Sequence, residues 1–188
     1  KMFILSLMLK KFHLSKKKVV ILCQMKETID LIQKLMKDNN YMYEQIDIST
    51  RGKSRFDAMM RFNNPSSNIF AFILDAKSGY YTMEADYVII YESSWNPIND
   101  IFISSKILTL NKKKIVYRLV TEDSFETTFF ENEPLLTNFD GSLIAQSDIS
   151  KIDMFIRSGA YYAFKDIDFD LDQVDINDIL NDNSKSLV

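Results

Sequence analysis

Apolar residues recur along the chain with two different periods, and the two periods alternate. The sequence predicts helices over residues 2–12, 54–62 and 98–110, and one marked by apolar positions from 29 to 36 that ends near Asn39-Asn40. The segments between them predict strands over residues 19–23, 43–48, 69–74, 87–91 and 115–120. The runs 69–74 and 87–91 are almost continuously apolar, which is typical of parallel strands covered on both faces. Strands that alternate with helices in this way predict an α/β fold with a doubly wound, mostly parallel sheet.

The pattern changes after residue 131. Residues 132–147 contain Pro134 and the pair Asp140-Gly141 and show no period, which predicts a linker. Beyond it, helical spacing predicts a short helix that ends at Gly159 and another over Val174–Leu180. The sequence therefore predicts a domain over 1–131, a linker over 132–147 and a small, acidic helical tail over 148–188.

Charge is distributed unevenly behind a formal net charge of -3. Residues 1–118 carry 19 lysines and arginines against 11 acidic residues, whereas residues 119–188 carry 4 against 15. A basic body with an acidic tail indicates a surface that faces a polyanion, and solvated charge without a function explains the same counts equally well. The tail either competes for that surface or keeps the chain soluble.

The residues suited to metal or disulfide chemistry are few. Cys23 and His13 are the single cysteine and histidine, which excludes a disulfide framework and a zinc site, and Cys23 is expected to be an inert, buried thiol. An EF-hand loop that starts at Asp166 would need glycine and glutamate where Leu171 and Asn177 stand. We therefore expect no metal site in this chain.

Several segments resemble one known family. Residues 19–25 are Val-Val-Ile-Leu-Cys-Gln-Met, and residues 91–97 are Tyr-Glu-Ser-Ser-Trp-Asn-Pro. They are similar to a strand that ends in Ser-Gln-Met and to an Asp-x-x-Trp-Asn-Pro loop in the second RecA-like lobe of the Swi/Snf-type chromatin-remodelling ATPases. Residues 117–121 resemble the closing strand of that lobe, and residues 156–160 resemble a helix after the motor. The resemblance covers most of the chain and is nearest the chromodomain-helicase and imitation-switch branches.

The resemblance implies a motor lobe that binds the backbone of double-stranded DNA, or of the nucleosome. It also implies that an ATP site is completed with an N-terminal RecA-like lobe of the same polypeptide, in the nucleus. ATP and Mg²⁺ are expected only together with that first lobe, because this chain has no Gly-x-x-x-x-Gly-Lys-Ser/Thr phosphate loop. No membrane contact is expected, because the apolar run 3–9 is far shorter than the ~20 residues of a membrane span.

The sequence departs from the family where the family contacts nucleotide. The loop that is Ser-Thr-x-Ala-Gly-Gly-x-Gly in the family retains only Gly79 over residues 75–82, and Tyr80 and Tyr81 obstruct the approach of phosphate. Residues 101–111 stand where the family has Gln-x-x-x-Arg-x-x-Arg-x-Gly-Gln, and Lys106 is their only cation. Arginine offers a planar fork of donors to the charge that develops in phosphoryl transfer, whereas lysine is a point charge.

Lys106 is thus either a partial catalytic substitute or an ordinary solvated helix residue. By the same resemblance, Asp75, Ser78 and Gly79 are expected to face the nucleotide. The resulting hypothesis is a lobe whose contribution to hydrolysis is weakened or lost, and the isolated chain is expected to be inactive. The alternative function is a catalytically inactive lobe that serves as a DNA- or chromatin-binding scaffold.

Candidate DNA contacts gather in the turns that follow predicted strands. One turn offers hydroxyls and cations beside a helix N-terminus: Ser49, Thr50, Arg51, Lys53 and Arg55. Lys77 lies in the next loop. Trp95, beside Asn96, either packs against a nucleic-acid sugar or stabilises its own loop. Three consecutive lysines either bind phosphate or merely solubilise a turn: Lys112, Lys113 and Lys114.

Overall fold

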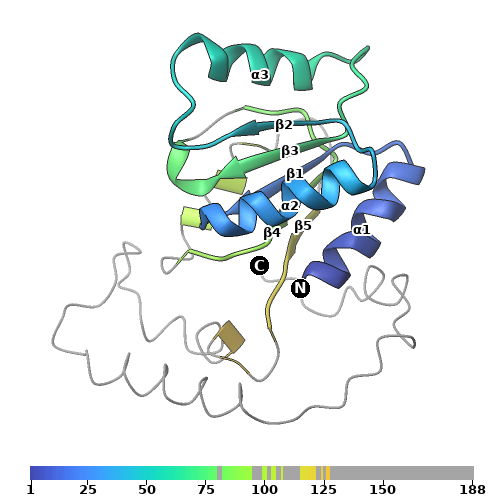
Figure 1. The fold of residues 1–188 in the computed structure, drawn as a ribbon, viewed down its shortest axis with the longest axis vertical. Helices are drawn as coiled ribbons and strands as arrows, with labels where there is room; N and C mark the ends of the chain where they lie inside the picture. The colour runs from blue at the N-terminus through green and yellow to red at the C-terminus, as the bar shows by residue number, and fades with distance from the viewer. Residues whose placement is uncertain are drawn as a thin grey trace, which may run out of the picture.

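The computed structural model describes residues 1–79, 82–94, 99–100, 103–104, 107, 115–121, 124 and 126–127. Five parallel strands form one sheet in the order β2-β3-β1-β4-β5, which is visible in Figure 1. Their bounds are β1 Val19–Cys23, β2 Tyr43–Ile46, β3 Ala71–Asp75, β4 Tyr87–Ile90 and β5 Ile115–Arg118. Because β1 is central, with β3 and β2 on one side of it, β4 and β5 on the other, and helices on both faces, the sheet is doubly wound, as predicted.

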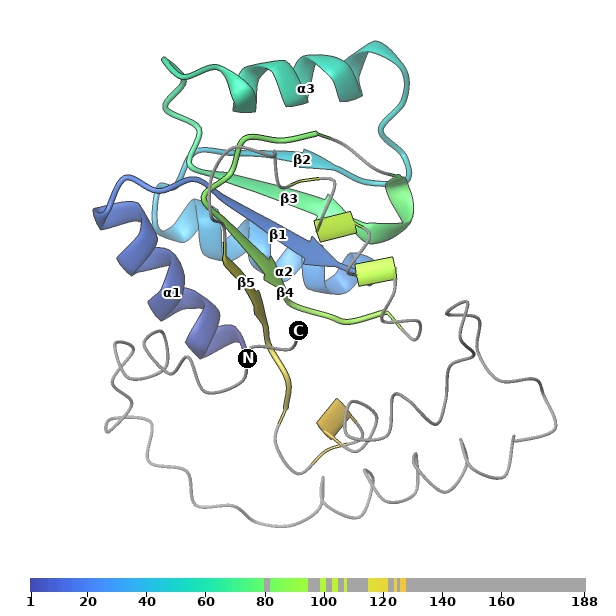
Figure 2. The ribbon, with the colours of Figure 1, turned by 180° about the vertical axis from the view of Figure 1, so that it is seen from behind.

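Helices cover both faces of the sheet (Figures 1 and 2). The helices are α1 Met2–Leu14, α2 Lys26–Asp38 and α3 Lys53–Asn63, and a short 3₁₀ turn, η1, spans Ala76–Ser78. On one face, α1 and α2 pack against β1, β3 and β4. On the other face, α3 packs together with Ile103 and Ile107. The described residues between 99 and 107 are helical, in agreement with the helix expected over 98–110.

The core explains why the central strands β1 and β3 are apolar at every position except Asp75, the last residue of β3. Every side chain of β1 and β3 is buried, with neighbouring residues alternating between the two faces. Phe72 and Phe62 make an edge-to-face contact at 5.3 Å on the α3 side. Cys23 is 0% exposed, which confirms the buried thiol, and burial raises its pKa well above the ordinary value.

Several predicted boundaries differ from the observed ones, for example those of β3, which spans Ala71–Asp75 where the sequence predicts 69–74. Strand β2 ends at Ile46 rather than residue 48, because Asp47 begins a hydrogen-bonded turn. Helix α2 begins at Lys26, earlier than its apolar pattern shows, because Glu92 supplies partners for its first turn. Strand β5 ends at Arg118. The predicted linker over 132–147 and the tail over 148–188 lie outside the described residues.

Candidate functional site

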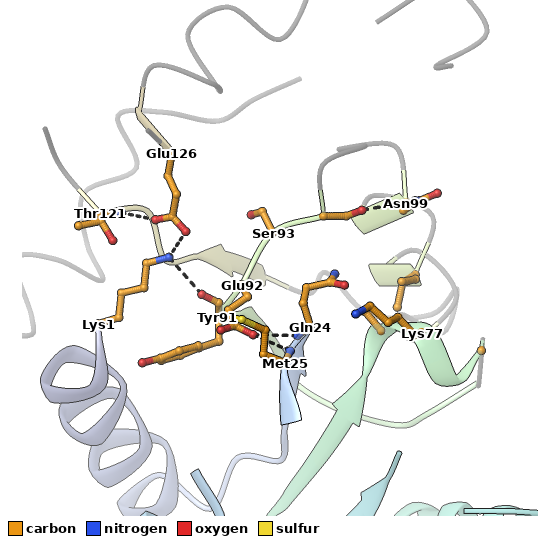
Figure 3. Close-up of a pocket in the computed structure, with 14 residues that line it drawn as sticks. Lys1, Gln24, Met25, Lys77, Tyr91, Glu92, Ser93, Asn99, Thr121 and Glu126 are labelled. Atoms are coloured by element: carbon orange, nitrogen blue, oxygen red, sulfur yellow. Dashed lines mark hydrogen bonds and ion pairs between the residues drawn. The ribbon is translucent and has the colours of Figure 1, made fainter. Parts of the chain in front are cut away.

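A cavity opens at the edge where the five parallel strands end. It has a volume of about 900 Å³, and Figure 3 shows the side chains that line it. Apart from Lys1, they come from the segments after β1, β3, β4 and β5, for example Gln24, Lys77, Ser93 and Thr121. The carboxyl edge of an open α/β sheet is the usual ligand site of such folds. The cavity is therefore the candidate functional site.

Two lysines are the cations among the described residues that line the cavity. Lys1 Nζ donates a hydrogen bond to the Tyr91 carbonyl at 3.3 Å and forms an ion pair with Glu126. Lys77 also lines the cavity and lies away from Lys1 in Figure 3. No arginine belongs to this described lining. The cations of the described lining are therefore ammonium groups, which are point charges without a guanidinium fork.

Glu92 connects the end of β4 to the start of α2. Its Oε2 accepts hydrogen bonds from the backbone N–H groups of Gln24 at 2.9 Å and Met25 at 3.0 Å. Its Oε1 accepts a hydrogen bond from the Thr28 hydroxyl at 2.5 Å. Met25, the N-cap of α2, has no capping hydrogen bond from its own side chain. The helix N-terminus, which attracts anions, is thus already bound to a carboxylate of the same lobe.

The turn after β3 contains the three residues expected to face nucleotide. Asp75 Oδ1 accepts a hydrogen bond from the Lys77 N–H at 2.8 Å, and the Ser78 hydroxyl donates to the Asp75 carbonyl at 2.7 Å. Asp75 is 6% and Ser78 is 7% exposed. Gly79 has φ of 114° and lines the cavity. The structure therefore places Gly79 at the cavity and uses the two polar side chains to hold the turn that precedes it.

Asp47 organises the turn that contains two of the predicted DNA contacts. Its Oδ1 accepts hydrogen bonds from the Ser49 hydroxyl at 2.6 Å and the Thr50 hydroxyl at 2.9 Å, and from the N–H groups of both residues. A hydrogen bond from the Ser49 hydroxyl holds the pKa of Asp47 well below its ordinary value, with smaller contributions from hydrogen bonds of Thr50 and Gln45, although partial burial opposes this. These hydroxyl protons point to Asp47, so a phosphate would have to replace that carboxylate.

The lowered pKa of Asp47 predicts a loss of stability in acid. A carboxyl group with a depressed folded-state pKa stabilises the fold above its unfolded pKa of about 3.9 and stops doing so as the pH falls through the folded value. We expect Asp47→Asn to remove about 1–2 kcal/mol at neutral pH, since hydrogen bonds to a charged group are lost. The difference between the two proteins should shrink below about pH 4, which urea unfolding at several pH values measures. A difference that stays constant down to pH 2 would contradict this assignment.

Arg55 holds two neighbouring turns together. Its Nη1 donates to the Ser78 carbonyl at 2.8 Å, its Nε donates to the Thr50 carbonyl, and its Nη2 donates to the Asp47 carbonyl at 3.4 Å. The turn after β2 is thereby tied to the turn after β3. The guanidinium group of this predicted DNA contact is engaged with backbone oxygens, whereas Arg51 and Lys53 are exposed beside it.

Arg118, at the end of β5, pairs with a buried carboxylate. Its Nη2 lies 3.6 Å from Asp100 Oδ2, and the two side chains are 18% and 1% exposed. Asp100 also accepts hydrogen bonds from the Ser94 N–H, at 3.1 Å to Oδ1 and 3.0 Å to Oδ2. The pair therefore fastens the segment after β4 to the edge strand.

Three acidic residues of the site, Asp47, Glu92 and Asp100, are not among the residues predicted from the sequence. The segment Asp-x-Ser-Thr at 47–50 is a turn signal that identifies the first, and Glu92 occupies the acidic position of the Trp-Asn-Pro loop. Asp100 gives no local signal. Within the described part of the chain, no group of acidic, histidine or cysteine side chains is arranged to hold a metal ion. In the same part, no helix is long and apolar enough to cross a membrane.

Six predicted site residues lie outside the described residues, so the structure leaves them as predictions. They are Trp95, Asn96, Lys106, Lys112, Lys113 and Lys114. Tyr80 and Tyr81, which are expected to obstruct phosphate, also lie outside the described residues.

Comparison with known proteins identifies the family of the chain. The family model for the helicase conserved C-terminal domain matches residues 2–108, which contain β1 to β4 and most of the cavity. The chain belongs to the helicase C-terminal domain family. The lobe expected from the Gln-Met strand and the Trp-Asn-Pro loop is thereby confirmed.

The relatives of this helicase C-terminal lobe are long proteins. It is 30% identical to chromodomain-helicase-DNA-binding protein 8 of Xenopus tropicalis, over 89% of this chain and 9% of that protein. It is 31% identical to protein 8 of Homo sapiens, over 89% of the chain and 7% of the relative. It is also 31% identical to chromodomain-helicase-DNA-binding protein 9 of Mus musculus, over 87% of this chain and 6% of that protein. The chain thus spans less than a tenth of the length of these relatives.

A solved structure supports the fold independently. The C-terminal part of the Fun30 ATPase domain superposes with a TM-score of 0.67 at 22% identity, covering 84% of this chain and 53% of that structure. At this identity the likeness concerns the fold alone. It agrees with the parallel sheet and confirms the predicted RecA-like architecture.

Proposed function

We propose that this helicase C-terminal lobe is the second motor lobe of a DNA-dependent ATPase that remodels nucleosomes. It would act in the nucleus, bind the DNA backbone and complete an ATP site with a first RecA-like lobe. The observation that carries the proposal is the family match over residues 2–108 together with the cavity at the carboxyl edge of the sheet. The relatives' names, which join helicase, chromodomain and DNA binding, support the same assignment.

Within this proposal, the lobe contributes weakly to hydrolysis. Transition-state charge on a transferring phosphoryl group is stabilised best by a planar guanidinium. The described lining of the cavity offers Lys1 and Lys77 instead, and Arg55 and Arg118 contact groups of their own lobe. These observations also favour the second candidate function, a catalytically inactive scaffold that binds DNA or chromatin.

A lobe exchange tests the proposal. The 186 aligned residues of human chromodomain-helicase-DNA-binding protein 8 would be replaced by this chain, and DNA-stimulated ATP hydrolysis would be measured. We expect turnover about 10³-fold or more below that of the parent, because loss of an arginine finger costs about 10³ to 10⁵. Lys106→Arg in the exchanged lobe should recover part of the rate, whereas Lys34→Arg on the exposed face of α2 should recover none.

The outcomes separate the two functions. Parental turnover that depends on Lys106 would reject the weakened lobe and leave an active motor. No recovery with Lys106→Arg, in a chimera that still binds DNA, would favour the scaffold. An unaltered 188-residue chain with no salt-dependent affinity for duplex DNA would reject DNA binding in either function.

A further inference from the structure

A cluster of lysines surrounds the turn between α1 and β1. Residues 1–26 contain no acidic residue, and five lysines lie within residues 10–18, at Lys10, Lys11, Lys16, Lys17 and Lys18. Lys10, Lys16 and Lys17 are exposed. Lys17 makes an ion pair with Asp86 at 3.2 Å, and both side chains are partly solvated. Among the described carboxylates, none forms an ion pair with Lys10 or Lys16.

This lysine turn lies at the opposite edge of the sheet from the cavity. Helix α1 begins beside the cavity, where Lys1 contacts the Tyr91 carbonyl at the end of β4. It ends at Leu14, just before β1 starts at Val19 (Figure 1). A helix of 13 residues is about 20 Å long, so the cavity and the lysine turn are separate surfaces.

Lys16 occupies a backbone position that usually belongs to glycine. Its φ is 53°, its N–H donates to the His13 carbonyl at 3.0 Å, and the Lys17 N–H donates to the Phe12 carbonyl at 3.0 Å. This pair of bonds is the Schellman motif, in which glycine or asparagine normally takes the left-handed position. At the end of α2, Asn40 takes it with φ of 55°. The chain thus keeps a cation where a lysine backbone is conformationally unfavourable.

The helix dipole alone does not explain this lysine. A cation near a helix C-terminus is favourable, but Lys11 and His13 already lie in the last turn of α1. Lys16 comes after the helix, and its side chain is exposed. Its conformational cost therefore indicates a role outside the fold, as strained residues at functional sites do.

We propose that this lysine turn is a second contact for the DNA phosphate backbone, distinct from the turns beside the cavity. The proposal rests on the proposed DNA-binding function. Exposed ammonium groups on flexible stems suit phosphate contacts that do not depend on sequence. Leu14, 74% exposed, is the one large apolar side chain exposed on the turn, which gives an acidic protein little apolar surface to cover.

The double variant Lys10→Gln, Lys16→Gly of the 188-residue chain tests the proposal. Binding to a short duplex of arbitrary sequence would be measured over a range of salt concentrations. Each phosphate contact contributes about 0.9 to the slope of log affinity against log salt, so we expect the slope to become about 2 less steep. Affinity at low salt should fall about tenfold. The single variant Lys16→Gly should raise the thermal midpoint, because glycine suits the positive φ, so weaker binding would not reflect damage to the fold.

The control variant Lys34→Gln, Lys37→Gln removes the same charge from exposed positions of α2 and should change affinity less than about twofold. An equal loss in this control, an unchanged slope in the test variant, or a lowered midpoint in Lys16→Gly would each overturn the proposal. Binding to polyglutamate would be measured in parallel as a probe for an acidic protein. If the unaltered chain bound polyglutamate, and both the test variant and Leu14→Ser lost that binding while keeping duplex binding, the partner would be an acidic protein and the proposal would be wrong. No duplex binding by the unaltered chain would overturn the proposed DNA binding as well.

Discussion

Replacing Glu92 with alanine is expected to lower the free energy of unfolding by about 2–3 kcal/mol, because hydrogen bonds to a charged group contribute about 1.5–3 kcal/mol. The carboxylate accepts from the N–H groups of Gln24 and Met25 and from the Thr28 hydroxyl. After the substitution, the first turn of α2 loses its acceptor, and loss of an N-terminal cap alone costs about 0.5–2 kcal/mol. Urea unfolding followed by circular dichroism measures the change.

Two further variants make this expectation specific. Glu92→Gln keeps one acceptor oxygen without the charge and should cost about half as much. Glu84→Ala removes an exposed carboxylate close to the sheet and should stay within about 0.5 kcal/mol of the unaltered chain. If Glu92→Ala behaved like Glu84→Ala, the helix start would depend on α2 itself, and its N-terminus would be open to an anion in the cavity.

The sheet could be predicted from sequence because its determinants are local. Strand β1 is apolar at every position, β3 is apolar at every position except its last residue, Asp75, and β1 has the same bounds in the sequence pattern and in the structure. Helix α2 shows why boundaries are harder. Its N-terminal partner, Glu92, is 67 residues away from Met25 along the chain, so no local pattern announces it.

The candidate site was predictable in position but less so in its contacts. The turns after β2 and β3 do lie at the carboxyl edge, as parallel strands require. What these turns do with their polar groups depends on long-range partners. Arg55 donates to the Ser78 carbonyl 23 residues on, and the Ser49 and Thr50 hydroxyls donate to Asp47. A sequence pattern of hydroxyls and cations therefore indicates a candidate anion-binding site at the carboxyl edge of the sheet. It does not show that carboxylates and carbonyls of the same lobe already accept hydrogen bonds from these groups.

Three turns at the carboxyl edge of the sheet share one feature: a carboxylate of the same lobe accepts their backbone N–H groups. Asp47, Asp75 and Glu92 each accept backbone N–H groups in the turn after β2, β3 or β1. Such N–H groups are the donors with which helix starts and turns bind phosphate. In this lobe they bind the lobe's own carboxylates and stabilise its loops, which is the arrangement expected under the proposed weak contribution to phosphoryl transfer.

Replacing Arg118 with methionine is expected to lower the free energy of unfolding by about 3 kcal/mol, because removing one partner of a buried ion pair leaves the other charge without its counter-ion. Asp100 is that other charge, and its side chain is 1% exposed. Asp100→Asn should cost less, about 1–2 kcal/mol, since its amide oxygen still accepts from the Ser94 N–H and Arg118 retains some contact with water.

The double variant decides how Arg118 is used. If Arg118 and Asp100 act as a pair, Asp100→Asn with Arg118→Met should be more stable than the sum of the single losses by about 1–2 kcal/mol in a double-mutant cycle. That coupling would mean that the guanidinium is needed to hold the segment after β4. Additive losses, or no loss with Arg118→Met alone, would instead make Arg118 a candidate for the nucleotide contact at the face of the first lobe. In that case the hypothesis of weakened hydrolysis would lose its main structural support, and Arg118→Met in the exchanged lobe should then abolish ATP turnover.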